Sequence, residues 1–170
     1  METLAILYLR LACVYGNIRQ FEFVEEYINK AVPLFAKTGF HHIVPSYDLM
    51  GDLQKGVAIH YRDNEHDFEK AYYYLLQALK SYRLVSPEDG RAELRDIAMI
   101  LQKLAWNSFV REDYESGERY CYQALARCKL LEDLEEVANT FAILGTIFSY
   151  SNNYYNAQEN YEMCVQMKED

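Results

Sequence analysis

One short pattern occurs four times along this chain of 170 residues and constrains its fold more than any single residue does. Each copy begins with an aromatic residue. A small or β-branched residue follows at offset 3, a medium-sized residue at offset 7 and a small residue at offset 10. Because 3.6 residues complete a helical turn, these offsets place the four side chains on one face of an α-helix. The copies are Phe21–Val24–Ile28–Ala31, Phe68–Ala71–Leu75–Ala78, Tyr114–Gly117–Cys121–Ala124 and Tyr154–Ala157–Tyr161–Cys164.

Successive copies begin 47, 46 and 40 residues apart. A helical face repeated at such a period is typical of stacked units, none of which buries its apolar side alone. We therefore predict an all-α array of eight helices, paired antiparallel in four repeats at about 2–37, 45–84, 88–130 and 133–168 of a single domain 1–170. The helices are expected at 2–16 and 20–37, 45–62 and 66–84, 88–111 and 114–130, 133–151 and 153–168. Such arrays usually bind proteins and seldom catalyse reactions, so we expect no enzyme.

The predicted helix ends carry suitable residues. Glu112–Asp113 and Asn152–Asn153 mark tight turns between helices. Gly39 suits a helix C-cap, and Pro87 suits the first position of a helix. Pro33 falls late in the second predicted helix, where it is expected to kink or end it.

The net charge of −9 is unevenly distributed, since residues 1–85 carry −1 and residues 86–170 carry −8. An acidic chain without a basic stripe is a poor candidate for direct nucleic-acid binding, which depends on neutralising phosphates. The acidic half would attract a partner with basic segments. The alternative is that acids such as Glu112, Asp113, Glu115 and Glu118 stabilise a helix N-terminus and face solvent.

The cysteines lack the spacing of a zinc site or a CxxC pair. Two of them, Cys121 and Cys164, occupy positions within the repeated pattern, as expected of reduced core thiols. No apolar run is long enough to span a bilayer, and Arg10 interrupts the apolar segment near the N-terminus. We therefore expect a cytoplasmic protein with no cofactor, no metal and no membrane contact.

The fourth repeat resembles a known family. Leu144–Gly145 followed by Phe148, and then by the fourth copy of the pattern, resembles the tetratricopeptide repeat (TPR), in which small residues let paired helices approach closely. Leu11–Ala12 with Tyr15 and Leu104–Ala105 with Ser108 match less fully. Val57–Ala58 with Tyr61 fits only if the turn at Arg62–His66 is about one residue longer. The resemblance covers essentially the whole chain and implies a right-handed α-solenoid with a concave groove.

Two departures from the family pattern are informative. These repeats run 40 to 47 residues instead of about 34. Lengthened repeats resemble those of peptide-sensing bacterial regulators of the Rap/PlcR/Rgg group. The chain also lacks an obvious polar helix at its ends, which solenoids need for solubility. Either it is a fragment of a longer protein, which we favour, or an end is covered by another subunit.

In the TPR family the first helices of the repeats line the groove. Carried over position by position, the resemblance implies a mixed lining of cations, amides, hydroxyls and aromatics. The proposed binding residues are Arg10, Asn17, Lys55, Arg62, Gln102, Trp106, Asn139, Thr146 and Tyr150. Cys13, Ile59 and Phe109 lie on the same face of these helices. Such a lining suits an extended peptide with Trp106 as an apolar anchor. The alternative is that Trp106 and Phe109 are buried between repeats.

The sequence bears on two finer mechanisms of such a groove. A co-chaperone type of carboxylate clamp is not expected, because Ile59 stands where that type has asparagine. The peptide-sensing regulators hold ligand backbone with asparagines, a role that Asn107 or Asn139 would fit.

Catalytic arrangements are absent from the sequence. The adjacent His41 and His42 point apart and would need further ligands from elsewhere, and His60 and His66 do not share a helical face. No phosphate-binding glycine loop, nucleophile elbow or HExxH occurs.

Three functions remain open on the sequence alone. The leading hypothesis is a non-catalytic adaptor that binds a protein or peptide in the groove. The second is the sensing half of a peptide-responsive regulator, and the third is a scaffold that forms a homodimer through an uncovered end of the array.

Overall fold

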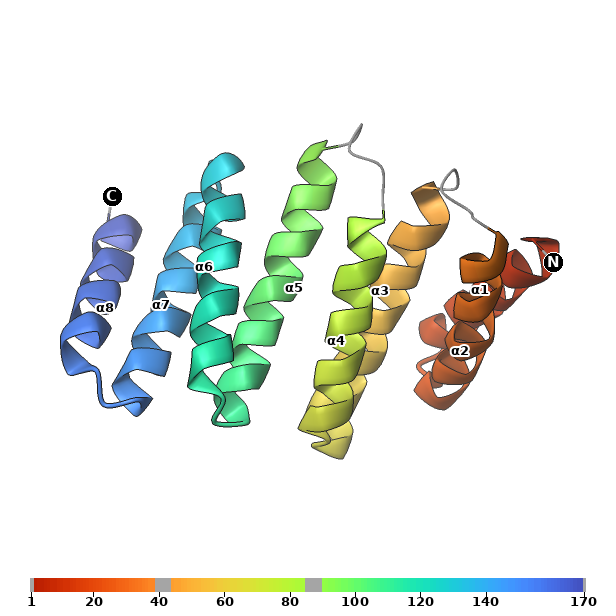
Figure 1. Cartoon of the computed structure of the whole chain (residues 1–170), viewed down its shortest axis with the longest axis horizontal. Helices are drawn as coiled ribbons and strands as arrows, with labels where there is room; N and C mark the ends of the chain where they lie inside the picture. Colours follow the sequence, from red (N-terminus) through yellow and green to blue (C-terminus); the bar gives the residue numbers. More distant parts are fainter. Residues whose placement is uncertain (1, 39–43, 85–89, 170) are drawn as a thin grey trace. The chain divides into compact units, whose positions relative to one another are not determined.

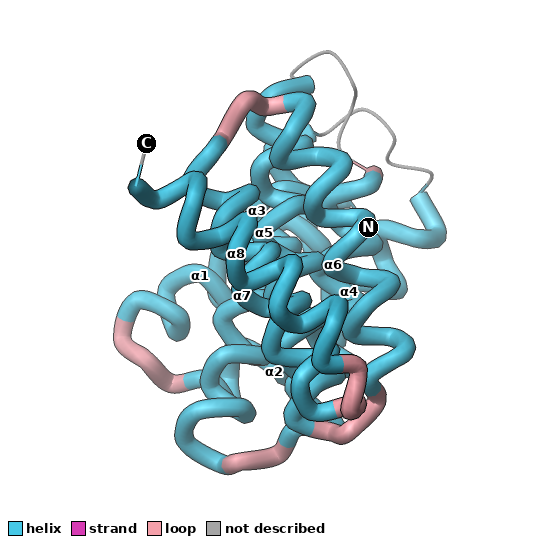
Figure 2. Tube along the Cα trace, turned by 90° about the vertical axis from the view of Figure 1, so that its left-hand side faces the viewer, coloured by secondary structure: helices cyan, strands magenta, loops and turns pink. Residues whose placement is uncertain are grey.

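The computed structural model describes residues 2–38, 44–84 and 90–169, and these form eight α-helices and one π-helical turn without a strand (Figures 1 and 2). The elements are α1 (Glu2–Asn17), α2 (Phe21–Thr38), α3 (Val44–His60), the π turn η1 (Tyr61–Glu65), α4 (Phe68–Arg83), α5 (Gly90–Val110), α6 (Tyr114–Leu130), α7 (Leu134–Tyr150) and α8 (Tyr154–Glu169). The predicted all-α fold with eight helices is confirmed. The expected caps at Gly39 and Pro87 lie outside the described residues, and Pro33 does not end α2.

The chain divides into two units, Met1–Glu88 with α1 to α4 and Asp89–Asp170 with α5 to α8. In each unit two helix pairs stack, as Figure 1 shows. In the first unit α1 packs on α2 and α3 on α4, and α2 contacts α3. In the second unit α5 packs on α6 and α7 on α8, and α6 contacts α7. Consecutive packing of neighbouring pairs is the arrangement of a helical-repeat solenoid.

The repeated sequence pattern forms the core of each unit. Eleven of the twelve residues at the second, third and fourth positions of the four copies are buried, and they are Val24, Ile28, Ala31, Ala71, Leu75, Ala78, Gly117, Cys121, Ala124, Ala157 and Cys164. Tyr161 of α8 is the one such position that is exposed, at 40%. The periodicity in the sequence therefore marks the seam along which the helices pack.

Each turn within a helix pair contains one residue in the left-handed conformation. These residues are Arg19, His66, Glu112 and Asn152, and Glu132 between the two pairs of the second unit adopts the same conformation. The residue that follows often caps the next helix, as Asp113 does by accepting a hydrogen bond from the Ser116 amide at 3.2 Å. The predicted tight turns at Glu112–Asp113 and Asn152–Asn153 are confirmed.

The turn between α3 and α4 contains one more residue than its counterparts. In the α5–α6 turn the Asp113 amide donates to the Ser108 carbonyl, five residues earlier, at 2.9 Å. In the α3–α4 turn the Asp67 amide donates to the Tyr61 carbonyl, six residues earlier, at 3.0 Å. The π turn η1 takes up the extra residue, which is the insertion that the position of Ala58 required.

Two glycines in α3 differ in the space around them. A methyl group on Gly51 would lie 2.7 Å from the ring of Tyr82, which is itself buried against α3. A methyl group on Gly56 would meet only Phe21, at an ordinary 3.6 Å. The first glycine is therefore required by packing and the second is not.

We predict that Gly51→Ala destabilises the first unit and that Gly56→Ala stabilises it. Alanine gains about 1 kcal/mol over glycine inside a helix. At position 51 this gain is outweighed by overpacking, which costs about 1–3 kcal/mol. Urea unfolding of both variants measures the difference, and Gly56→Ala serves as the matched control on the same helix. Equal shifts in both variants would contradict the packing argument.

Candidate functional site

Two of the predicted groove aromatics lie on adjacent first helices of the second unit. Trp106 of α5 is 42% exposed and Tyr150 at the end of α7 is 63% exposed. The half-buried Phe109 joins them, with its ring centre 5.2 Å from that of Trp106 and 5.0 Å from that of Tyr150. We call Trp106, Phe109 and Tyr150 the α5–α7 aromatic face. Its rings are held in tilted and edge-to-face contacts, the geometries that aromatic pairs prefer.

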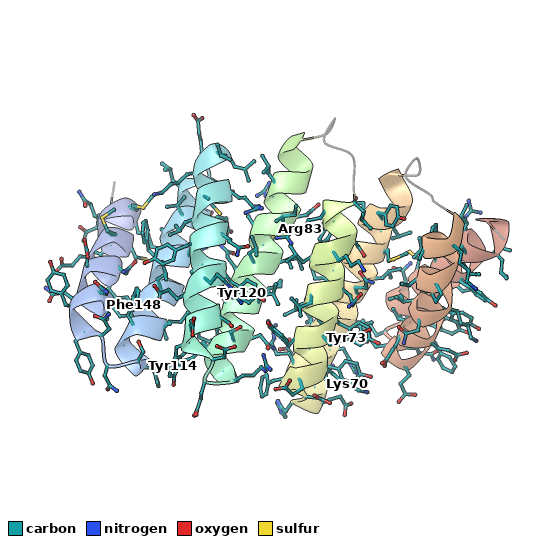
Figure 3. All side chains as sticks on the ribbon, in the orientation of Figure 1. Lys70, Tyr73, Arg83, Tyr114, Tyr120 and Phe148 are labelled. Atoms are coloured by element: carbon teal, nitrogen blue, oxygen red, sulfur yellow. The ribbon has the colours of Figure 1, made fainter. Side chains whose placement is uncertain are left out.

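The helical phase explains why these side chains meet. Gln102, Trp106 and Phe109 are spaced four and three residues apart, so they share one face of α5. Tyr114, which Figure 3 labels at the start of α6, has its ring centre 6.2 Å from that of Phe109. The first residue of α6 therefore packs beside the aromatic face.

Gln102 links α5 to α7. Its amide nitrogen donates to the Glu136 carbonyl at 3.2 Å and to the Thr140 hydroxyl at 2.9 Å. The two donor positions of this amide are therefore engaged within the unit. Gln102 fixes the spacing of the helices that carry the aromatic face.

The other two predicted groove residues of α7 contact α8. The Thr146 and Tyr161 hydroxyls are 2.9 Å apart, and Lys168 Nζ donates to Asn139 Oδ1 at 3.3 Å. Asn107, considered for ligand-backbone recognition, is fully buried, and its amide has no hydrogen-bond partner among the described residues. Asn107 therefore offers no accessible surface to a ligand.

In the first unit the predicted groove residues do not converge on one point. Lys55 Nζ lies 2.9 Å from Asp52 and 5.8 Å from the centre of the Tyr82 ring, so it is held toward α4. Arg62 lies in η1 and pairs with Asp63 at 2.6 Å. Arg10 and Asn17 are exposed on α1.

A cleft of about 530 Å³ opens beside the π turn and was not predicted from the sequence. Its lining combines a cation, an imidazole, a carboxylate, an amide and an aromatic ring. The lining residues are Gly16, Arg19, Phe21, Gly56, Ile59, His60, Asp63 and Asn64. His60 stacks on Phe21 with ring centres 4.8 Å apart, and its Nδ1 lies 2.8 Å from the Asn64 amide nitrogen. The extra residue in the turn was the sequence signal for this cleft, since π turns are frequent at functional sites.

A polar network fixes the π turn to α2 and α4. The Glu25 carboxylate accepts hydrogen bonds from the Tyr61 hydroxyl and, at 2.7 Å, from the Tyr74 hydroxyl. Lys70, labelled near the start of α4 in Figure 3, donates to the Tyr61 hydroxyl at 3.1 Å and lies over its ring. Burial, and then the hydrogen bond to Glu25, raise the pKa of Tyr74 above its ordinary value. The same two causes raise the pKa of Tyr61.

Other chemistry-bearing groups do not form a site in the described part of the chain. Residues 2–38, 44–84 and 90–169 contain no cluster of His, Cys, Asp or Glu suited to a metal ion, and His41 and His42 lie outside them. Burial raises the pKa of Cys121 to about 12 and that of Cys128 to about 11, so both thiols stay protonated at neutral pH. No described helix has the length and apolar character needed to cross a membrane.

Two solved structures resemble this fold. BtubC (BKLC) from P. vanneervenii matches 98% of this chain over 64% of its own length, with a TM-score of 0.69 and 19% sequence identity. A signal transduction ATPase with numerous domains from Pyrococcus horikoshii, which has a tetratricopeptide repeat sensor, matches 96% of this chain over 23% of its own length. Its TM-score is 0.65 and its sequence identity is 18%. No protein-family model and no curated protein matches the chain. The fold is that of TPR-like helical repeats.

The Tyr74 network predicts a loss of stability at high pH. Because the folded-state pKa of Tyr74 is raised, its stabilising effect is complete below pH 10, the ordinary tyrosine value. It is lost as the pH rises from there toward the folded-state value, by at most about 1.4 kcal/mol per pH unit for one proton.

Urea unfolding of the first unit between pH 8 and 11.5 tests this prediction. Tyr74→Phe should flatten the decline above pH 10, whereas Tyr73→Phe, which removes an exposed neighbouring hydroxyl, should leave it unchanged. An identical pH dependence in wild type and Tyr74→Phe would show that the network does not carry the effect.

Proposed function

We propose that the protein is a non-catalytic adaptor that binds an extended peptide or protein segment on the α5–α7 aromatic face. The observation that carries this proposal is the exposure of Trp106 and Tyr150, which Phe109 holds together across two helices. Exposed tryptophan and tyrosine side chains with restricted motion are the commonest residues to dominate binding energy. The rings are already held in place before a ligand binds, so binding costs little side-chain conformational entropy.

The remaining predicted groove residues surround this anchor in the proposal. In the second unit the ligand backbone would compete with Lys168 and Tyr161 for the Asn139 amide and the Thr146 hydroxyl, with Gln102 linking α5 to α7. In the first unit, taken by itself, the groove residues of the proposal are Arg10, Asn17, Lys55 and Arg62. A ligand with basic segments is favoured because residues 86–170 carry a charge of −8.

Selection of random peptides on the immobilised protein, followed by affinity measurement, tests the proposal. The selected peptides should be rich in Lys and Arg and should contain an apolar anchor residue. Trp106→Ala and Tyr150→Ala should each weaken binding by at least about tenfold, as central aromatic contacts do.

The matched control is Tyr122→Ala, which truncates an exposed tyrosine on the second helix α6. It should leave the affinity unchanged. If the selected peptides bind Trp106→Ala as tightly as wild type, the ligand occupies another surface and the aromatic face is not the site.

A second candidate function is supported by the likeness to a protein with a tetratricopeptide repeat sensor. In this alternative, as in the Rap/PlcR/Rgg group, peptide binding changes the array and an attached output domain responds. Hydrogen exchange with and without a selected peptide separates the two functions. An adaptor should be protected only at the aromatic face, whereas a sensor should also change in helices that do not touch the peptide.

A further inference from the structure

A small pocket lies between α2, α3 and α4 of the first unit, and we call it the α2–α4 pocket. Its volume is about 100 Å³, and most of its wall is apolar. The apolar part of the wall consists of Val32, Phe35, Ala36, Tyr47, Met50 and Leu84. All of these residues belong to the first unit, so the pocket is a property of that unit alone.

The volume of the pocket sets the size of a ligand. An apolar cavity of about 150 Å³ holds one benzene ring. In proportion, a volume of about 100 Å³ holds roughly four carbon atoms. The pocket therefore suits a short aliphatic chain and excludes a large ring system.

Gln54 of α3 places an amide in this apolar wall. Its side chain is buried, with 2% of the residue exposed, and its Oε1 accepts a hydrogen bond from the buried Ser81 hydroxyl at 2.6 Å. Its Nε2 has no hydrogen-bond partner among the described residues, and this atom is not sealed from the pocket that Gln54 lines. A buried amide N–H is unfavourable without an acceptor, so the pocket favours a ligand that supplies one.

The other repeats can be compared with this one in a register that two hydrogen bonds support. Asp52 of α3 stands six residues before the small residue Ala58, and Asn139 of α7 stands six residues before Gly145. Asp52 accepts a hydrogen bond from Tyr82 of α4, and Asn139 accepts one from Lys168 of α8. Tyr82 and Lys168 each follow the leading aromatic residue of their pattern by fourteen positions.

In this register the polar pair of the pocket has apolar counterparts. Gln54 corresponds to Leu101 of α5 and to Phe141 of α7, and Ser81 corresponds to Met167 of α8. The second unit forms its helix pairs with apolar side chains at these positions. The fold therefore does not require an amide and a hydroxyl here, and their presence in the first unit indicates a binding role.

The charges around the pocket favour an anionic ligand. Lys80 lines the pocket, and no acidic residue does so in the part of the chain that the structure describes. On α3, Asp48 and Asp52 are outside the pocket wall, and Asp52 is engaged by Lys55 and Tyr82. Ser81, which bonds Gln54, adjoins Lys80 in the chain, so one small anion can reach both the amide and the ammonium group.

We propose that the α2–α4 pocket binds a small aliphatic carboxylate. The aliphatic chain contacts the apolar wall, and the carboxylate accepts a hydrogen bond from Gln54 Nε2 and pairs with the Lys80 ammonium group. Hydrogen bonds to an ionised carboxylate are stronger than those between neutral groups. The pocket shares no residue with the α5–α7 aromatic face, so failure of this proposal would leave the proposed function untouched.

Ligand-detected NMR titration of the full chain with sodium 3-methylbutanoate tests the proposal. Binding should saturate with a Kd of about 1 mM or below, since the ligand is small. The alcohol and the amine with the same carbon skeleton should bind at least about tenfold more weakly, because neither carries a carboxylate. Binding that does not saturate, or equal affinity for the amine, would overturn the proposal.

Two variants locate the binding site. Lys80→Met removes the ammonium group at an exposed position, and the double variant Gln54→Leu with Ser81→Met replaces the polar pair by apolar residues, as in the second unit. Each should weaken binding at least about tenfold. Lys129→Met, which removes an exposed cation from α6, is the matched control and should bind as wild type does.

Circular dichroism verifies that the double variant is folded, and Lys80→Met keeps the test decisive if it is not. Wild-type affinity in Lys80→Met or in a folded double variant would overturn the proposal, because the carboxylate would then be bound by other groups.

Discussion

The distance between packed helices is the constraint on which each unit of this protein depends. At Gly117 it is set from two sides at once, because an added methyl group would lie 3.3 Å from the Ala105 carbonyl oxygen of α5 and 2.9 Å from Ile147 of α7. Only a residue without a side chain lets α6 contact both first helices so closely. One face of α5 and of α7 packs against α6 in this seam. A different face of each of these two helices carries the exposed rings of Trp106 and Tyr150.

The π turn shows how the repeat tolerates an insertion. One extra residue in a regular helix would rotate everything beyond it by about 100° and remove the small residues from the seam. In η1 the residue is absorbed at the end of α3, so Ala58 and Ala71 both remain buried. Hydrogen bonds from Tyr61 and Tyr74 to Glu25 hold this turn to the neighbouring helix α2. Asp63 and Asn64 of this turn line the cleft beside it.

The sequence was sufficient for the helices, the seam and the position of the insertion, because each follows from local spacing. It was less informative about the site, since helical phase names the face of a residue but not its neighbours on another helix. Asn139 and Thr146 have the phase of groove residues, yet Lys168 and Tyr161 of α8 engage their polar atoms. The helical phase also left open whether Trp106 is buried. Its burial depends on its contact with Phe109 and on the residues of other helices that pack around these two rings.

The buried apolar residues of α7 have counterparts in α1. Leu144 and Ile147 of α7 are buried, whereas Leu11 and Val14, at the same distances before the next helix, are 40% and 57% exposed. A repeat that can stack within a chain must have two faces that are apolar before they are covered. Such a face packs best against a helix whose apolar residues have the same spacing, because the side chains of the two helices then interdigitate and exclude water. In the proposed function the ligand contacts a face of α5 and α7 that this helix packing leaves exposed.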